Sequence, residues 1–95
     1  MSTNTLDTDA ILGTALELHP QVALRPEPFG ALAYHYGNRR LVFLKHVDMV
    51  AVARQLGEHP TLQATLVACG VAPARWPSFA TAFQSLQSSE VVRVR

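Results

Sequence analysis

The stretch "FGALAYHYGNRRLVFLK", residues 29–45, decides the fold. One run with a period of two reaches Gly37-Asn38, a dipeptide typical of two-residue hairpin turns with a positive φ at glycine, and a second apolar run follows. The pattern predicts a β-hairpin in which Tyr34 lies opposite Leu41. In this register both faces of the hairpin are apolar, which is unusual for a simple meander with one face in water.

The preceding segment, "HPQVALRPEP", alternates apolar and polar positions and contains Pro20, Pro26 and Pro28. Proline cannot donate a hydrogen bond to a β-ladder, so this strand belongs at the edge of a sheet. We predict three antiparallel strands, at about residues 20–25, 30–36 and 40–45. The last of them lies at the opposite edge, where Lys45 alone would discourage pairing with another chain.

After residue 45 the apolar period becomes helical. A helix over 48–56 is predicted to start with Asp48 as its cap, and a helix over 61–69 with Thr61 as its cap. A third, over 76–88, has the strongest apolar stripe of the chain. The predicted fold class is therefore α+β, a three-stranded antiparallel sheet followed by a three-helix bundle, similar to a winged helix-turn-helix.

The two ends of the chain are predicted with less structure. Residues 1–17 are expected to form a flexible or partly helical segment, and residues 18–95 form the domain. Within the segment, "AILGTALEL" has one or two amphipathic helical turns as its expected structure, although Gly13 weakens a helix. The tail "VVRVR", residues 91–95, is either a short strand or an exposed end.

Composition excludes several classes of protein. The chain has 95 residues, of which 48% are hydrophobic and 16% charged, which is the composition of one globular domain. Its net charge of +1 gives no general attraction to nucleic acid or membrane surfaces. The single cysteine excludes an internal disulfide, and the first twenty residues lack the basic region of a signal peptide. We expect a soluble cytoplasmic protein.

Catalytic and metal-binding patterns are not found in the sequence. The histidines at 19, 35, 46 and 59 have none of the helical spacings of a zinc site. Cys69 precedes Gly70 at the expected C-terminal end of a helix, where the helix dipole disfavours a thiolate. There is no Gly-rich phosphate loop and no nucleophile elbow. The sequence predicts no metal site, no cofactor and no enzyme activity.

Two binding functions remain. A winged helix suggests DNA binding, but the predicted third helix has no charged residue between Trp76 and Ser89 to contact phosphates. The open strand at residues 41–45 suggests instead that a partner strand adds to the sheet. The alternatives are that the N-terminal segment or the tail covers this edge, or that two copies of the chain pair there as a homodimer.

The segment "LHPQVALRPEPFGALAYHYGNRRLVFLK", residues 18–45, closely resembles the peptide chaperones of mycofactocin biosynthesis. From about residue 19 to residue 92 the layout is similar to the wider PqqD-like family of precursor-peptide recognition domains, with a helix end at Leu56-Gly57 and a helix start at Thr61-Leu62. The chain differs from the family after the third helix, where Ser89-Glu90 stands in place of a usual glycine.

The resemblance implies a function. Such proteins bind the leader of a ribosomally synthesised precursor peptide and present it to a radical S-adenosylmethionine maturase, without catalysis or a cofactor of their own. In the family the leader lies as an added strand between the third strand and the third helix. Carried onto this chain, the peptide-binding residues are Arg39, Arg40, Leu41, Val42, Phe43, Leu44, Lys45, Ala80, Phe83, Gln84 and Gln87. The three basic residues flank the groove, where they would attract an acidic leader.

Overall fold

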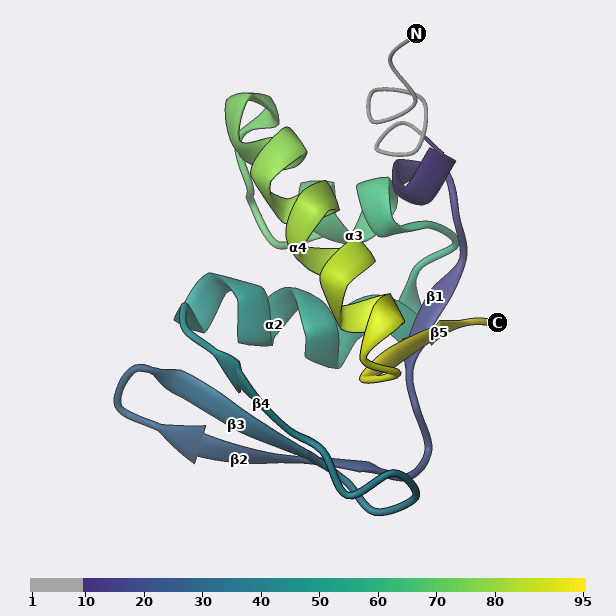
Figure 1. The fold of residues 1–95 in the computed structure, drawn as a ribbon. Helices are drawn as coiled ribbons and strands as arrows, with labels where there is room; N and C mark the ends of the chain where they lie inside the picture. Colours follow the sequence, from purple (N-terminus) through teal and green to yellow (C-terminus); the bar gives the residue numbers. More distant parts are fainter. Residues whose placement is uncertain (1–9) are drawn as a thin grey trace, which may run out of the picture.

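The computed structural model describes residues 10–95 and shows a small sheet beneath a group of helices (Figure 1). Strands β2 (Val22–Glu27), β3 (Gly30–His35) and β4 (Leu41–Leu44) form an antiparallel sheet in the order β2-β3-β4. Helices α2 (Val47–Gln55), α3 (Leu62–Ala68) and α4 (Trp76–Ser88) follow. The predicted α+β class, with three strands before three helices, is confirmed.

The hairpin has the predicted register but a different turn. Tyr34 pairs with Leu41, as expected. The turn spans residues 36–39 and is closed by a hydrogen bond from the His35 N–H to the Arg40 carbonyl at 3.0 Å. The positive φ lies at Arg39 (62°) and not at Gly37. The register survives because the longer turn is still centred on the bond between residues 37 and 38.

The imidazole of His35 organises this turn. Its Nδ1 accepts hydrogen bonds from the N–H groups of Gly37 and Asn38, at 3.0 and 3.1 Å. The ring is buried, with 3% of the residue exposed. The buried ring of His35 is therefore an internal acceptor for two backbone donors of the turn.

The two ends of the described chain pair with each other. Strand β1 (Leu16–Leu18) lies antiparallel to β5 (Val92–Val94), and Leu16 is almost completely buried. Helical turns were expected across this region, but the described helix there covers only residues 10–12. Residues 1–9 of the expected flexible segment lie outside the described residues. The "VVRVR" tail is a strand, and its partner is β1 rather than β4.

The helix starts follow the sequence in part. Thr61 caps α3 as predicted, because its Oγ1 accepts the Ala64 N–H at 3.1 Å. The prediction for α2 was wrong: His46 is the N-cap, and Asp48 lies in the first turn, where its carboxylate pairs with Arg75 at 2.9 Å. Short 3₁₀ helices, η1 (Leu56–Glu58) and η2 (Pro73–Arg75), follow α2 and precede α4.

Helix α4 is followed by Glu90, which adopts the backbone conformation of the glycine that the family resemblance leads one to expect. Its φ is 64°, in the left-handed region, and the Val91 N–H bonds back to the Leu86 carbonyl at 2.9 Å. This is the usual geometry of a helix end, for which glycine carries no steric penalty. The chain therefore keeps the expected turn at some cost in backbone strain.

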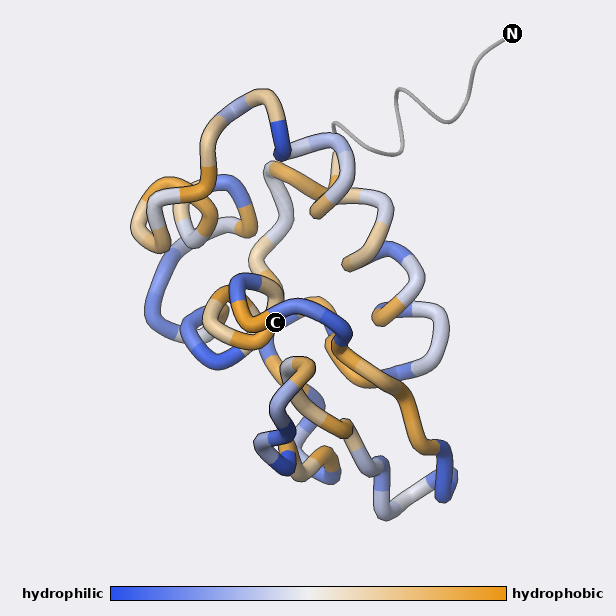
Figure 2. Tube along the Cα trace, turned by 90° about the vertical axis from the view of Figure 1, so that its left-hand side faces the viewer, coloured by the Kyte–Doolittle hydropathy of each residue, from blue (hydrophilic) through white to orange (hydrophobic). Residues whose placement is uncertain are grey.

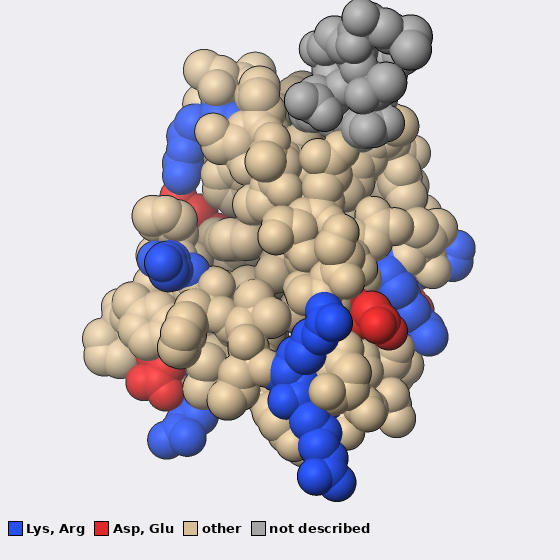
Figure 3. All heavy atoms as spheres, in the orientation of Figure 1, with Lys and Arg blue, Asp and Glu red and all other residues tan. Residues whose placement is uncertain are grey.

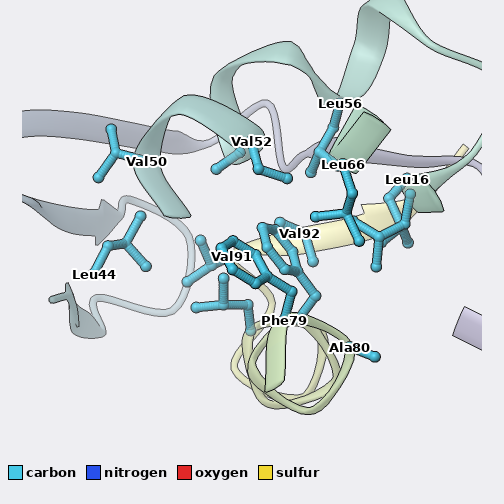
Figure 4. Close-up of a cluster of buried hydrophobic side chains, with 14 of the residues drawn as sticks. Leu16, Leu44, Val50, Val52, Leu56, Leu66, Phe79, Ala80, Val91 and Val92 are labelled. Carbon is cyan, nitrogen blue, oxygen red and sulfur yellow. The ribbon is translucent and has the colours of Figure 1, made fainter. Parts of the chain in front are cut away.

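The core lies between the inner face of the sheet and the helices (Figure 4). The sheet contributes Ala31, Ala33 and Leu44, each with 0% exposed, and α4 contributes Phe83, also fully buried. Of the two apolar faces of the hairpin, the one with the smaller side chains is thus buried. The bulkier face carries Leu41 and Phe43, which are 59% and 61% exposed.

Two leucines of β4 test this assignment with the same chemical change. We expect Leu44→Ala to lower the free energy of unfolding by about 2–5 kcal/mol, because it leaves a cavity in the core. We expect Leu41→Ala to change it by less than about 0.5 kcal/mol, because that side chain is exposed. Urea denaturation measured by circular dichroism compares the two. Equal losses would show that the faces are assigned wrongly.

Candidate functional site

Strand β4 has an open outer edge. It is the last strand in the order β2-β3-β4, and within residues 10–95 no strand pairs with its outer side. In Figure 2, β4 is the unbroken hydrophobic segment that rises from the hydrophilic turn at the lower right. Neither the tail nor residues 16–18 cover this edge, because they pair with each other.

The hydrogen-bond pattern shows which groups of β4 face outward. The His35 N–H bonds to Arg40, and the Tyr36 N–H bonds to the Gln21 carbonyl on the other side of β3. Because bonding alternates along an antiparallel pair, the backbone groups of residues 40, 42 and 44 face β3. The N–H and C=O groups of Leu41, Phe43 and Lys45 therefore face outward, where a further strand could bond to them.

A hollow of about 150 Å³ lies where β4 ends and α2 and α4 begin. Met49, Phe79 and Ala82 give it an apolar lining. Its edge carries Arg75, whose guanidinium lies 5.2 Å from the centre of the Phe79 ring. The remaining lining residues are His46 and Ser78. In Figure 3 the surface on the left is hollowed between basic side chains.

The predicted residues of the third helix do not all reach this side. Ala80 and Phe83 are fully buried in the core, so a bound peptide could not touch them without displacing the helix. Gln84 and Gln87 line a different hollow, of about 240 Å³, together with Ile11 and Val94. They lie on the flank of α4 that faces the chain ends.

The flank of α4 that meets the end of β4 carries Ser78, Phe79 and Ala82. Sequence reasoning missed these residues. Periodicity finds the apolar stripe of a helix and its two flanks, but it does not say which flank faces a given strand. Which flank of α4 faces β4 depends on how the helix crosses the sheet.

The predicted basic residues lie at both ends of the open strand. Arg39 and Arg40 are in the turn before β4, and Lys45 follows it; all three are exposed. Among the described residues none of them forms an ion pair, since the three ion pairs join Arg25 to Glu27, Arg75 to Asp48 and Arg93 to Glu17. Figure 3 shows basic side chains over the lower end of the sheet, where the β3–β4 turn lies in Figure 1.

Two histidines and a carboxylate meet beside the β3–β4 turn, which their spacing in the sequence could not show. Nitrogen atoms of His19 and His35 and a carboxylate oxygen of Glu90 lie within 4.8 Å of one another. However, Nδ1 of His35 accepts two backbone N–H groups and Nδ1 of His19 accepts the Gln21 N–H. The neutral rings therefore carry their protons on Nε2, which leaves no lone pair there for a cation. These residues do not fit a metal site.

Cys69 is the cap at the C-terminal end of α3, and its N–H bonds to the Thr65 carbonyl. Partial burial raises the pKa of its thiol. The thiolate is the nucleophilic form, so less of it is present at neutral pH than in a free cysteine. This agrees with the sequence analysis, in which the position of Cys69 at the C-terminal end of a helix disfavours a thiolate.

The rate of alkylation measures the reactivity of the Cys69 thiol directly. At pH 7 we expect iodoacetamide to react with Cys69 more slowly in the folded protein than in the urea-unfolded chain, because the raised pKa lowers the thiolate fraction. The rate should rise with pH beyond the pH at which the unfolded chain reaches its plateau. Mass spectrometry follows the modification. A faster reaction in the folded state would contradict the assignment.

Comparison with known proteins gives a consistent result. A model of the peptide chaperone MftB family matches residues 15–93. A peptide chaperone MftB of Mycobacterium ulcerans is 44% identical over 75 residues, 79% of this chain and 69% of that protein. Proteins of the same name from Mycolicibacterium smegmatis and Mycobacterium tuberculosis are 56% and 52% identical, over 58% and 57% of this chain.

These alignments cover 54% and 50% of the last two relatives, so the chain matches about half of their length. No solved structure matches the chain significantly. Among residues 10–95, no helix is both long and apolar enough to cross a membrane. The relatives carry the name of a chaperone, and the family is not one of enzymes. On the match over residues 15–93, this chain belongs to the peptide chaperone MftB family.

Proposed function

We propose that this peptide chaperone binds the leader of a ribosomally synthesised precursor peptide as a fourth strand on β4. One observation carries the proposal: the backbone groups of Leu41, Phe43 and Lys45 face outward, with no partner strand in the described part of the chain. A peptide that adds a strand gains affinity from main-chain hydrogen bonds and specificity from side-chain pockets.

The two edges of the sheet support this assignment because they differ. Strand β2 contains Pro26, and Pro20 and Pro28 stand just outside it. Proline removes donors and discourages strand addition at that edge. Strand β4 has no proline and no charged residue within Leu41–Leu44. A partner strand is therefore directed to one side of the sheet.

Charge supports an acidic peptide. Arg39, Arg40 and Lys45 lie at the two ends of the open strand without ion-pair partners among the described residues. Exposed cations around a binding site raise the association rate of an anionic partner more than its final affinity. We assign these three residues to steering, and we expect their effect to weaken as salt is added.

The identity of the enzyme that receives the peptide is inferred from the family resemblance. We propose that the bound leader is presented to the radical S-adenosylmethionine maturase of mycofactocin biosynthesis, in the cytoplasm. An added strand leaves the rest of the precursor free to reach an enzyme, which suits such a role. A second copy of the chain is the competing occupant of the open edge, and the peptide should displace it.

A DNA-binding winged helix is the other candidate. In that role α4 would present its outer surface to phosphates, yet it has no charged residue between Trp76 and Ser89. Arg75 is paired with Asp48. DNA affinity would fall steeply with salt, because binding releases counterions, whereas an added strand in apolar pockets responds much less.

The direct test is calorimetric titration with the synthetic precursor peptide encoded beside the gene, its leader and core halves tested separately. We expect binding to the leader half in a one-to-one ratio, and none to the core half. Binding to neither half by a folded, monomeric protein would overturn the proposal.

A proline in β4 tests the mode of binding. Leu41→Pro removes an outward N–H at the first residue of an edge strand, where proline is tolerated. We expect the Kd for the leader to rise about tenfold relative to Leu41→Ala, because one interfacial donor is lost. Leu41→Ala is the matched control, since it removes the same side chain and keeps the donor. Equal Kd values for the two variants would show that this N–H is not used.

A further inference from the structure

We infer that the protein recognises both faces of the added strand, and that the outer face of the sheet holds a second peptide subsite, formed by Phe29, Phe43 and Lys45. This inference rests on the proposed function. It assigns a role to a hollow of about 470 Å³ on the face of the sheet that points away from the helices.

The geometry of strands leads to this assignment. Successive side chains alternate between the two faces of a sheet. On β4, Val42 and Leu44 point toward the helices, so Phe43 and Lys45 point to the outer face. A peptide residue directly opposite Phe43 has its side chain on that same outer face, with its Cβ about 5 Å from the Cβ of Phe43.

The outer hollow is held in place by the backbone. Gly30 has φ +151°, and a Cβ at that position would lie 2.1 Å from the Leu44 carbonyl oxygen. This close approach fixes the turn between β2 and β3 against the end of β4. The turn places Phe29 beside Phe43, with ring centres 5.8 Å apart and the planes at 82°. The subsite is therefore formed before a peptide arrives.

Both aromatic side chains of the hollow are accessible from outside. Phe29 is 42% exposed and Phe43 is 61% exposed, although they lie next to each other. Adjacent exposed aromatic side chains mark interaction sites more often than single ones do. The hollow is continuous with the open edge, because Phe43 belongs to both. A strand on that edge is thus the occupant that fits, and it fills the hollow with its alternate side chains.

The chemistry of the occupant follows from the lining. The peptide residue opposite Phe43 should be large and apolar, to pack with the two rings. The residue opposite Lys45, two positions away on the same face, should be acidic. The residue between them points to the inner face, near Met49, Phe79 and Ala82, and should be apolar and of moderate size. The recognised segment therefore has an acidic and a large apolar residue separated by one apolar residue.

The test combines variants of the protein with the synthetic leader peptide, and calorimetry measures the Kd. We expect Phe43→Ala and Phe29→Ala each to raise the Kd about tenfold, the effect of exposing much of one aromatic side chain. Val67→Ala is the matched control, because Val67 is equally exposed, at 60%, but lies on α3. Urea denaturation confirms that each variant is folded, and Phe29, in a turn, gives a second variant if Phe43→Ala is unstable.

An alanine scan of the peptide then locates the contact. We expect the loss caused by one alanine to disappear in the Phe43→Ala background, while the losses at its two neighbours persist, since they point to the other face. Phe43→Ala with unchanged affinity, while Leu41→Pro weakens binding, would overturn the second subsite and leave strand addition intact. Unchanged affinity in both variants would overturn the second subsite and show in addition that the Leu41 N–H is not used. If Phe43→Ala lost binding to the maturase but kept its affinity for the peptide, this face would belong to the enzyme interface and the inference would be overturned.

Discussion

The small side chains of Ala31 and Ala33 are the constraint on which the rest of the structure depends. Both are fully buried on the inner face of β3, where the helices pack against the sheet. Larger residues there would hold the helices away, and the core around Phe83 would not close. Side chains alternate along β3, so the larger Leu32 and Tyr34 stand on its outer face. The exposed aromatic residues are thus a consequence of how the sheet is packed.

The same packing explains why the outer edge of β4 has no partner strand among the described residues. The helices cover the inner face of β2-β3-β4, and β1 and β5 pair with each other in a separate two-stranded sheet. Nothing among residues 10–95 is left over to cover β4. The structure differs in this respect from an ordinary meander, in which both edges are shortened, charged or covered. Here one edge contains proline and the other has no partner strand among residues 10–95, in agreement with the proposed side of strand addition.

Local patterns predicted much of this fold. The period-two run and the Gly37-Asn38 centre gave the register of the hairpin, and the bounds of the third helix, 76–88, agree with α4. The Thr61 cap also follows from local chemistry. The β1–β5 pair could not be found in this way, because short strands at residues 16–18 and 92–94 depend on each other. Asp48 was misplaced because its partner, Arg75, is distant in sequence.

In the candidate site, too, local patterns predicted some features, whereas features that depend on contacts distant in sequence were not predicted. For residues 41–45 an open backbone edge was predicted from the order of the strands, but the exposed face of the hairpin was not, because both faces are apolar. The flank of α4 that lies beside the end of β4 was not predicted, because Gln84 and Phe79 lie on opposite flanks of one apolar stripe. The position of Phe29 beside Phe43, and the proximity of His19, His35 and Glu90, were not predicted either. In each case a turn brings together side chains whose spacing in the sequence carries no signal.

The pairing of β1 with β5 has a consequence for how the chain folds. The hairpin joins residues that are close in sequence, whereas the Glu17–Arg93 ion pair joins residues 76 positions apart. Closing a long loop costs more chain entropy than closing a short one, so contacts of this kind form late unless other contacts shorten the loop. The hairpin and the three helices supply such contacts. We therefore expect β4, the proposed site of strand addition, to form early, and the two ends of the domain to join after the hairpin has formed.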